Sequence, residues 1–213
     1  MLITEQQFRR MMPNAGNRLD AHWPFINPAM EEGKINTPKR ITAFLAQLAH
    51  ESGEYRYMEE LADGSAYEGR ADLGNVQPGD GRKFKGHGPI QITGRDNHRD
   101  CGVELGLDLV KEPTLIARPE HGTRAAVWFW NSRDLSLLAD RDWFRVITLR
   151  INGGTNGWAD RLTYYMRNRQ ILKLPPYSAI EEDLAIRKFQ RANGLGDDGN
   201  VGRETMKAVR AAA

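Results

Sequence analysis

A long amphipathic helix followed by an even longer glycine-containing segment limits what this chain can fold into. Thr37-Pro38 is a helix start signal, because threonine caps the first turn and proline fits the first helical position. Apolar residues recur at helical spacing from there to about residue 52, and Gly53 ends the pattern. Residues 54 to 100 hold many glycines and few apolar runs, so we predict mostly loop, with one or two short helices and a small hairpin near residues 82 to 92. A loop of this length is usually functional or disordered, and its aromatic and charged residues favour a functional one.

Helices are also predicted before and after this region, which makes the fold class mainly α. Thr4 and Gln7 form a capping-box pair that begins a first helix. Pro24 and Pro28 interrupt the helical pattern of residues 17 to 32, so we predict two short helices there. A short helix should follow residue 112, and longer ones should span about residues 119–130, 140–150, 158–172, 180–192 and 203–212.

The composition fits one full domain plus a small module. The chain has 213 residues, of which 40% are hydrophobic and 27% charged, with a formal net charge of +2. That charge is too small to indicate nucleic-acid binding, although it suits an anionic polymer such as a bacterial cell wall. The proline-marked segment 173–177 predicts a boundary between a domain of residues 1–174 and a helical tail of residues 178–213.

Several classes of protein are disfavoured by what the sequence lacks. Cys101 is the only cysteine, so no intrachain disulfide forms, which fits folding in a reducing cytosol. The N-terminal residues lack the features of a signal peptide, and no segment approaches the roughly 20 apolar residues of a membrane span. His50-Glu51 is not followed by a second histidine at helical spacing, and no nucleotide-binding loop or serine elbow is present. We therefore expect no metal, no cofactor, no membrane insertion and a monomer.

Glu51 is the strongest candidate for chemistry. It shares one helix face with Phe44 and Leu48, at spacings i, i+4 and i+7. A carboxylate on an apolar stripe loses solvation, which favours its protonated form and suits a general acid. Hydrolysis of a glycosidic bond needs a second carboxyl group, about 6.5–9.5 Å away in inverting enzymes. The following loop offers four acids, among which spacing alone does not choose: Glu59, Glu60, Asp63 and Glu68.

A second polar cluster lies at residues 86 to 97. In an extended stretch Gln91 and Thr93 face the same way, and together they can hold a water or the N-acetyl group of a sugar. The alternative is an edge strand with a solvated face. Asn152 lies at a glycine-marked break where it can face a cleft. Arg161 lies on the first turns of the next helix, either on the surface or paired with a catalytic carboxylate.

These residues together match a known pattern. The matching segments are Phe44–Gln47, His50–Gly53, Phe84–Asn97 and Ile151–Arg161. The chain resembles the family 19 glycoside hydrolases, which have the chitinase-like fold, and most closely their bacteriophage endolysin branch. The resemblance covers residues 1 to 174. It implies a lysozyme-like, α-rich catalytic domain with a deep sugar-binding cleft.

The resemblance also implies roles for individual residues. Glu51 falls on the general-acid position, and Thr93 falls where the family orients the attacking water. Four residues fall on substrate-binding or site-supporting positions: Gln91, Asn97, Asn152 and Arg161. Plant members carry the general base in a longer loop, so similarity to the endolysin branch selects Glu60 as the base, with Glu68 in reserve. The implied mechanism is inversion at the sugar carbon.

The tail and the domain together imply a function. Residues 185–195 and 198–205 resemble the second half of a peptidoglycan-binding repeat. Segments under about 40 residues seldom fold alone, so this tail either packs on the catalytic domain or only completes the fold. The implied function is an endolysin that hydrolyses β-1,4 bonds of peptidoglycan glycan strands. It would stay in the host cytoplasm until another factor, such as a holin, opens the membrane. The alternatives are a chitinase, a lytic transglycosylase and a non-catalytic wall-binding protein.

Overall fold

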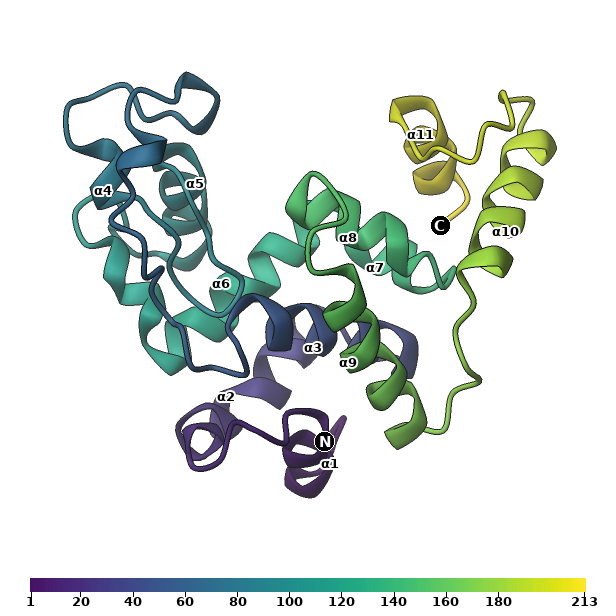
Figure 1. Cartoon of the computed structure of the whole chain (residues 1–213), viewed down its shortest axis with the longest axis horizontal. Helices are drawn as coiled ribbons and strands as arrows, with labels where there is room; N and C mark the ends of the chain where they lie inside the picture. Colours follow the sequence, from purple (N-terminus) through teal and green to yellow (C-terminus); the bar gives the residue numbers. More distant parts are fainter.

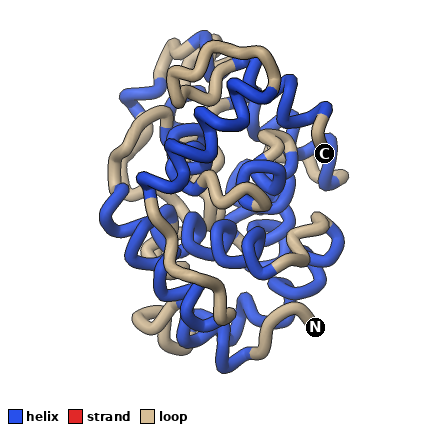
Figure 2. The backbone as a smooth tube through the Cα atoms, turned by 90° about the vertical axis from the view of Figure 1, so that its right-hand side faces the viewer, coloured by secondary structure: helices blue, strands red, loops and turns tan.

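The computed structural model describes residues 1–213 as helices joined by turns and loops, without a β-strand (Figures 1 and 2). The α-helices are α1 Glu5–Met11, α2 Arg18–Glu32, α3 Pro38–Glu51, α4 Asp80–Lys83, α5 Arg95–Leu105, α6 Pro119–Asn131, α7 Leu135–Ala139, α8 Phe144–Asn152, α9 Trp158–Ile171, α10 Ala179–Ala192 and α11 Arg203–Ala211. The short 3-10 helices are η1 Ser65–Tyr67, η2 Ala71–Leu73 and η3 Pro113–Ala117. This confirms the mainly α fold class. None of these helices combines the length and the apolar character needed to cross a membrane.

The helix α3 forms the centre of the fold, with α9 packed along it (Figure 1). Thr37 caps α3 by accepting a hydrogen bond from the backbone N–H of Arg40, and the helix begins at Pro38 as predicted. Every residue from Ile41 to Ala49 is buried. A helix that is buried on all sides needs neighbours all round, so α3 is a core helix rather than the half-exposed one that its sequence indicates.

Residues 18–32 form one helix, α2, so the prediction of two short helices is wrong. Pro24 and Pro28 both lie inside α2. A proline in a helix removes a backbone hydrogen bond and crowds the preceding turn, at a cost of roughly 3 kcal/mol. Ile26 and Met30 are fully buried, and α2 packs against α6. This tertiary packing offsets the local cost of the prolines.

The chain between α3 and α5 is mostly loop, as predicted, and buried polar side chains hold it in place. Asp80 is only 2% exposed and forms an ion pair with Arg95 at the start of α5. The Arg95 guanidinium holds the pKa of Asp80 below its usual value. The backbone N–H of Arg95 donates to the side chain of Asn75 at 2.8 Å. These contacts tie the loop to α5, which begins inside the region predicted as loop.

The predicted helix over residues 140 to 150 starts later in the structure. A separate short helix, α7, ends at Ala139, and α8 begins only at Phe144. Between them Asp142 has a φ of +59°, a left-handed conformation that a continuous α-helix does not accommodate. The other predicted helices, α6, α9, α10 and α11, lie within two residues of their expected bounds.

The tail packs on the rest of the chain, as the sequence suggested for so short a segment. Glu182 of α10 is 3% exposed and accepts hydrogen bonds from the N–H groups of Arg145 and Val146, at 2.9 and 3.1 Å. Phe189 of α10 meets Trp143 edge-to-face, with ring centroids 5.5 Å apart. Three tail residues belong to the same hydrophobic cluster as the rest of the core: Ile186, Met206 and Val209. The predicted boundary after residue 174 falls in the connection between α9 and α10.

Candidate active site

A pocket of about 250 Å³ lies at the C-terminal end of α3. Its walls come from α3, η2, the turn before α5, and parts of α5, α6 and α8. The lining residues are Glu51, Leu73, Ile90, Gln91, Thr93, Asn97, Phe129, Arg133, Arg150, Ile151 and Asn152. Five of the eight residues predicted from the sequence are therefore brought together around one pocket. The other three, Glu60, Glu68 and Arg161, lie outside its lining.

The acid at the end of α3 is held from behind by α9. Arg161 is 2% exposed, and its Nη2 donates to Glu51 Oε1 at 2.6 Å, so the predicted pairing is present. Arg161 also donates to the side-chain oxygen of Gln47 and to the carbonyl of Asn156. The amide of Gln47 in turn donates to Thr148 Oγ1 at 3.0 Å. The ion pair fixes the position of the Glu51 carboxyl group, because Arg161 is itself held by Gln47 and Asn156.

A second side-chain contact joins the same two helices one residue earlier. His50 Nδ1 lies 2.6 Å from an Asp160 carboxylate oxygen. Gly157, just before α9, has a φ of +70°, and a Cβ there would lie 2.2 Å from Cε1 of His50. Only glycine lets the chain pass this close to the ring. His50 thus positions the start of α9, and with it Arg161, in a role that its sequence context did not reveal.

The polar cluster before α5 is a tight turn rather than the predicted extended stretch. His87 and Ile92 exchange backbone hydrogen bonds of 3.0 and 2.9 Å across the turn, the only trace of the expected hairpin. Gln91 has a φ of +55°, and its side-chain amide donates to two backbone carbonyls, at 3.0 and 2.9 Å. Thr93 Oγ1 donates to the carbonyl of Gln91 at 3.1 Å. Both side chains still line the pocket, because the turn directs them there instead of strand alternation.

Glu60 lies immediately behind this turn. Its Oε1 accepts a hydrogen bond from the hydroxyl of Tyr67 at 3.0 Å, and its Oε2 accepts one from the N–H of Gly86 at 2.9 Å. A Cβ added to Gly86 would lie 2.5 Å from Gln91 Oε1 and 3.3 Å from Glu60 Oε2. Glu60 and Gln91 are therefore neighbours across Gly86, so Glu60 lies behind a residue of the pocket lining without belonging to the lining itself.

Comparison with known proteins identifies the family. Residues 25–137 match the family model for class I chitinases. The chain belongs to this family, glycoside hydrolase family 19. A second model, a peptidoglycan binding domain, matches residues 183–209 in the tail.

Relatives of this class I chitinase domain occur in plants and bacteria. An endochitinase of Arabidopsis thaliana is 37% identical over 190 residues, which cover 82% of this chain and 65% of that protein. A glycosyl hydrolase family 19 domain-containing protein of Haemophilus influenzae is 29% identical over 197 residues, covering 78% of this chain and 94% of that protein. The chain spans only 40% of another Arabidopsis endochitinase, to which it is 42% identical over 117 residues. It is thus shorter than these plant relatives.

Solved structures confirm the fold. Chitinase C of Streptomyces griseus aligns with a TM-score of 0.62 and 24% sequence identity, over 84% of this chain and 79% of the other. At this level of identity the likeness shows that the two chains share the helix-rich chitinase fold.

The remaining predicted residues of the class I chitinase domain differ in their surroundings. Asn97 donates to the carbonyl of Thr93 at 2.7 Å, and Asn152 donates to the carbonyl of Asn156 at 3.1 Å, so both are anchored at the pocket. Glu68 is exposed, and its two oxygens accept 2.7 Å hydrogen bonds from the N–H groups of two glycines at the start of α4. This geometry gives Glu68 a capping contact away from the pocket and favours Glu60 over it as the candidate base.

Two charged residues of the pocket, Arg133 and Arg150, were not predicted from the sequence. Arg133 stacks over the ring of Phe129, with its guanidinium carbon 3.6 Å from the ring centroid. Neither arginine belongs to the motifs that carry the family resemblance. No local signal marked them, because an arginine near a helix end is usually a solvated surface residue.

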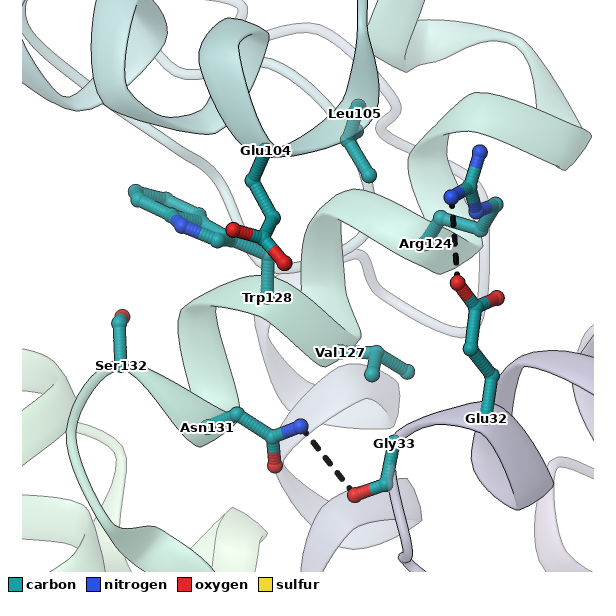
Figure 3. Close-up of a pocket in the computed structure, with 9 residues that line it drawn as sticks. All are labelled: Glu32, Gly33, Glu104, Leu105, Arg124, Val127, Trp128, Asn131 and Ser132. Carbon is teal, nitrogen blue, oxygen red and sulfur yellow. Dashed lines mark hydrogen bonds and ion pairs between the residues drawn. The ribbon is translucent and has the colours of Figure 1, made fainter.

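A separate pocket of about 300 Å³ lies between α2, α5 and α6, on another face of α6 (Figure 3). There Arg124 points at Glu32 and forms an ion pair of 3.1 Å, while Asn131 donates to the carbonyl of Gly33 at 3.2 Å (Figure 3). The lining contains none of the residues predicted from the sequence. This pocket contains two carboxylates, Glu32 and Glu104, and Arg124 pairs with the first, so the pocket lacks a free acidic pair. We therefore place the candidate active site at Glu51.

Proposed function

We propose that this chain hydrolyses β-1,4 glycosidic bonds of peptidoglycan, with Glu51 as the general acid. The observation that carries the proposal is the setting of Glu51, which is 18% exposed at the pocket wall and held by the buried Arg161. Polar side chains suited to sugar hydroxyl and N-acetyl groups surround it. Membership of the class I chitinases supports the reaction class, and the tail's match to a peptidoglycan binding domain supports the polymer.

The mechanism we propose is single displacement with inversion. Glu51 gives its proton to the glycosidic oxygen that leaves, while Glu60 takes a proton from a water on the opposite sugar face. Arg161 occupies Glu51 Oε1, which leaves Oε2 to carry the proton, and it stabilises the carboxylate that forms on transfer. Glu60 accepts two hydrogen bonds, from Tyr67 and Gly86, which fix the orientation of its carboxyl group. Thr93 orients the water.

Three other functions compete with this proposal. A chitinase would use the same machinery on neutral N-acetylglucosamine polymers, and the Arabidopsis relatives are named endochitinases. A lytic transglycosylase needs only the acid. A non-catalytic wall binder is the third, since a Hevea brasiliensis protein that is 32% identical over 176 residues is named an inactive chitinase-like protein. We further propose, from the motif resemblance, that the chain is a phage endolysin held in the host cytoplasm until lysis and acting as a monomer.

Mass spectrometry of fragments released from purified sacculi separates these functions. Hydrolysis yields new reducing ends, and transglycosylation yields 1,6-anhydro products. Turnover of chitin oligomers but not of sacculi would identify a chitinase, and sedimentation with walls without any release would identify a binder. The endolysin role is tested by expressing the chain in a bacterium with and without a holin and following lysis.

Substitution of Glu51 tests the assignment of the acid. Glu51→Gln keeps an oxygen that can accept from Arg161 but removes the opposite charge, so the chain should still fold, with a loss of stability smaller than that of a variant that removes the contact altogether. The hydrolysis rate should fall by about 10² to 10⁴, the usual contribution of general acid catalysis. Glu60→Gln should cause a comparable loss and Glu68→Gln a small one. Glu59→Gln, the same change on an exposed loop acid paired with Lys85, is the matched control. Normal lysis of walls by Glu51→Gln would contradict the proposal.

A further inference from the structure

Two arginines line the pocket beside Glu51 without a carboxylate to pair with. Arg133 follows the end of α6, and Arg150 lies in the last turn of α8. Neither takes part in any ion pair within the chain. Glu51, the only acid in the lining, is engaged by Arg161 instead. The pocket therefore carries positive charge that the protein itself does not neutralise.

Arg133 is oriented by neutral groups alone. Its Nη2 donates to Asn97 Oδ1 at 3.3 Å, and its Nη1 donates to the Ser132 hydroxyl at 3.0 Å and to the carbonyl of Phe129 at 3.4 Å. The stacking on the Phe129 ring holds the guanidinium plane in place. Burial lowers the pKa of Arg133 from its usual value, yet a guanidinium remains charged at any physiological pH. A desolvated cation without a partner is costly, unless a ligand supplies the opposite charge.

Arg150 is in the same situation at the other side of the pocket. Its Nη2 donates to the carbonyl of Val201 in the tail at 3.4 Å, and its Nε is buried without any partner. Burial and the nearby charge of Arg210 lower the pKa of Arg150. Arg210, on α11, is itself paired with Asp134 at 2.6 Å. Asp134 also lies near Arg150 and acts to raise its pKa, but the carboxylate of Asp134 is engaged by Arg210. The contact with the carbonyl of Val201 helps to hold Arg150 in position.

We infer that Arg133 and Arg150 form an anion subsite of the cleft, which binds a carboxylate carried by the glycan chain. The inference rests on the proposed function, because it assigns a substrate class to the same pocket. Guanidinium groups bind carboxylates through paired, charge-assisted hydrogen bonds. The units of chitin are neutral. Every second sugar of peptidoglycan carries a lactyl group that ends in a carboxylate or continues into a peptide with carboxylates of its own. The subsite therefore selects the wall polymer over chitin.

Substrate preference tests this subsite. Arg133→Gln and Arg150→Gln, singly and together, are compared with Arg10→Gln, which removes the same charge from an exposed position on α1 outside the pocket. The measured quantity is the ratio of kcat/KM on soluble peptidoglycan strands to kcat/KM on chitin oligomers. We expect each pocket substitution to lower this ratio about tenfold, mainly through KM, as for a lost hydrogen bond to a charged group. An equal loss on both polymers, or an equal change in Arg10→Gln, would overturn the inference.

A binding measurement keeps the inference testable without turnover. The chain is titrated with N-acetylmuramic acid and with its methyl ester, which has the same shape but lacks the charge, and binding is followed by NMR. The acid should bind more tightly than the ester, and the difference should disappear in the double arginine variant. If neither polymer is cleaved, the proposed hydrolase function is wrong. The binding titration still shows whether the two arginines bind a carboxylate. Equal binding of acid and ester would overturn the subsite and leave the hydrolase proposal standing.

Discussion

The two sides of the candidate active site are built in different ways. On the side of Glu51, buried side chains connect three helices, and Arg161 reaches Glu51 across 110 residues of sequence. On the side of Glu60, hydrogen bonds to nearby backbone groups do the positioning, as between Glu60 and Gly86, which are 26 residues apart. The acid is thus held by the tertiary core, whereas the candidate base and Gln91 are held by turns.

This difference predicts different responses to perturbation. Breaking the contacts around Glu51 should affect the global unfolding of the chain, because α3 and α9 form its centre (Figure 1). Breaking the contacts around Glu60 should open the loop locally while the core remains folded.

The largest effect on stability should come from Arg161→Leu. This change leaves the carboxylate of Glu51 and the amide of Gln47 without their buried partner. Removing one member of a buried ion pair typically costs about 3–5 kcal/mol, which a denaturant titration measures as the free energy of unfolding. The double variant Arg161→Leu with Glu51→Leu should recover part of that loss, since no charge is left unpaired. A loss below about 1 kcal/mol in the single variant would argue against the contrast.

Acid should weaken the loop side first. His87 and His98 are buried under the turn that carries Gln91, with a ring nitrogen of each 3.1 Å apart. Burial lowers the pKa of both, that of His98 to about 4. At His98 the unfolded chain therefore binds a proton below about pH 6.5 that the folded chain does not bind until about pH 4. The stability that His98 contributes is complete above pH 6.5 and is lost as the pH falls toward 4, by up to about 1.4 kcal/mol per pH unit. His87 adds a loss of the same sign.

Hydrogen exchange measures where this loss occurs. Between pH 7 and 5, after correction for intrinsic exchange rates, protection should fall more in residues 87–98 than in α3. His22 on α2, whose pKa burial also lowers to about 4, adds a global loss of the same sign. His98→Asn should reduce the pH dependence of residues 87–98. Equal loss of protection in α3 and in residues 87–98 would show that the two sides unfold together.

A smaller effect is expected from Gly86→Ala. The added methyl group meets the side chain of Gln91 and the carboxylate of Glu60, so both must shift. We expect kcat on sacculi to fall about tenfold, because small misplacements of reacting groups are costly, while the unfolding midpoint changes little. Gly196→Ala in the tail, where no atom lies within 4 Å of the new Cβ, is the matched control. If kcat is unchanged in Gly86→Ala, Glu60 takes no part in the reaction.

The smallest effect should follow Thr37→Ala. Thr37 caps α3 at the end opposite to Glu51, and loss of an N-cap costs about 1 kcal/mol. Thermal unfolding should show a small decrease in the midpoint, and hydrolysis at a temperature well below that midpoint should be normal. If the hydrolysis rate falls as much as in Gly86→Ala, a small change at the start of α3 also alters the position of Glu51 at its end.

The sequence by itself determined the helix class and most helix bounds. Caps, prolines and glycines act within a few residues, so α1, α3, α6, α9, α10 and α11 were predictable from local patterns. Glu51 at the end of α3 and the polar residues near Gln91 were also identifiable as a candidate site. Local patterns did not reveal that Gln91 lies in a turn. Apolar and polar residues alternate from Ile90 to Thr93, and this alternation also predicts a short strand.

Only the tertiary structure decided which of these residues meet. The helix α2 continues through two prolines, because its burial against α6 outweighs the lost backbone hydrogen bonds. The sequence pattern shows only the prolines and not this burial. The tertiary structure also paired Arg161 with Glu51, and it placed Arg133 and Arg150 at the pocket without acidic partners. Such contacts join residues far apart in the chain, and their energy depends on burial and charge in three dimensions, which no pattern of neighbouring residues encodes.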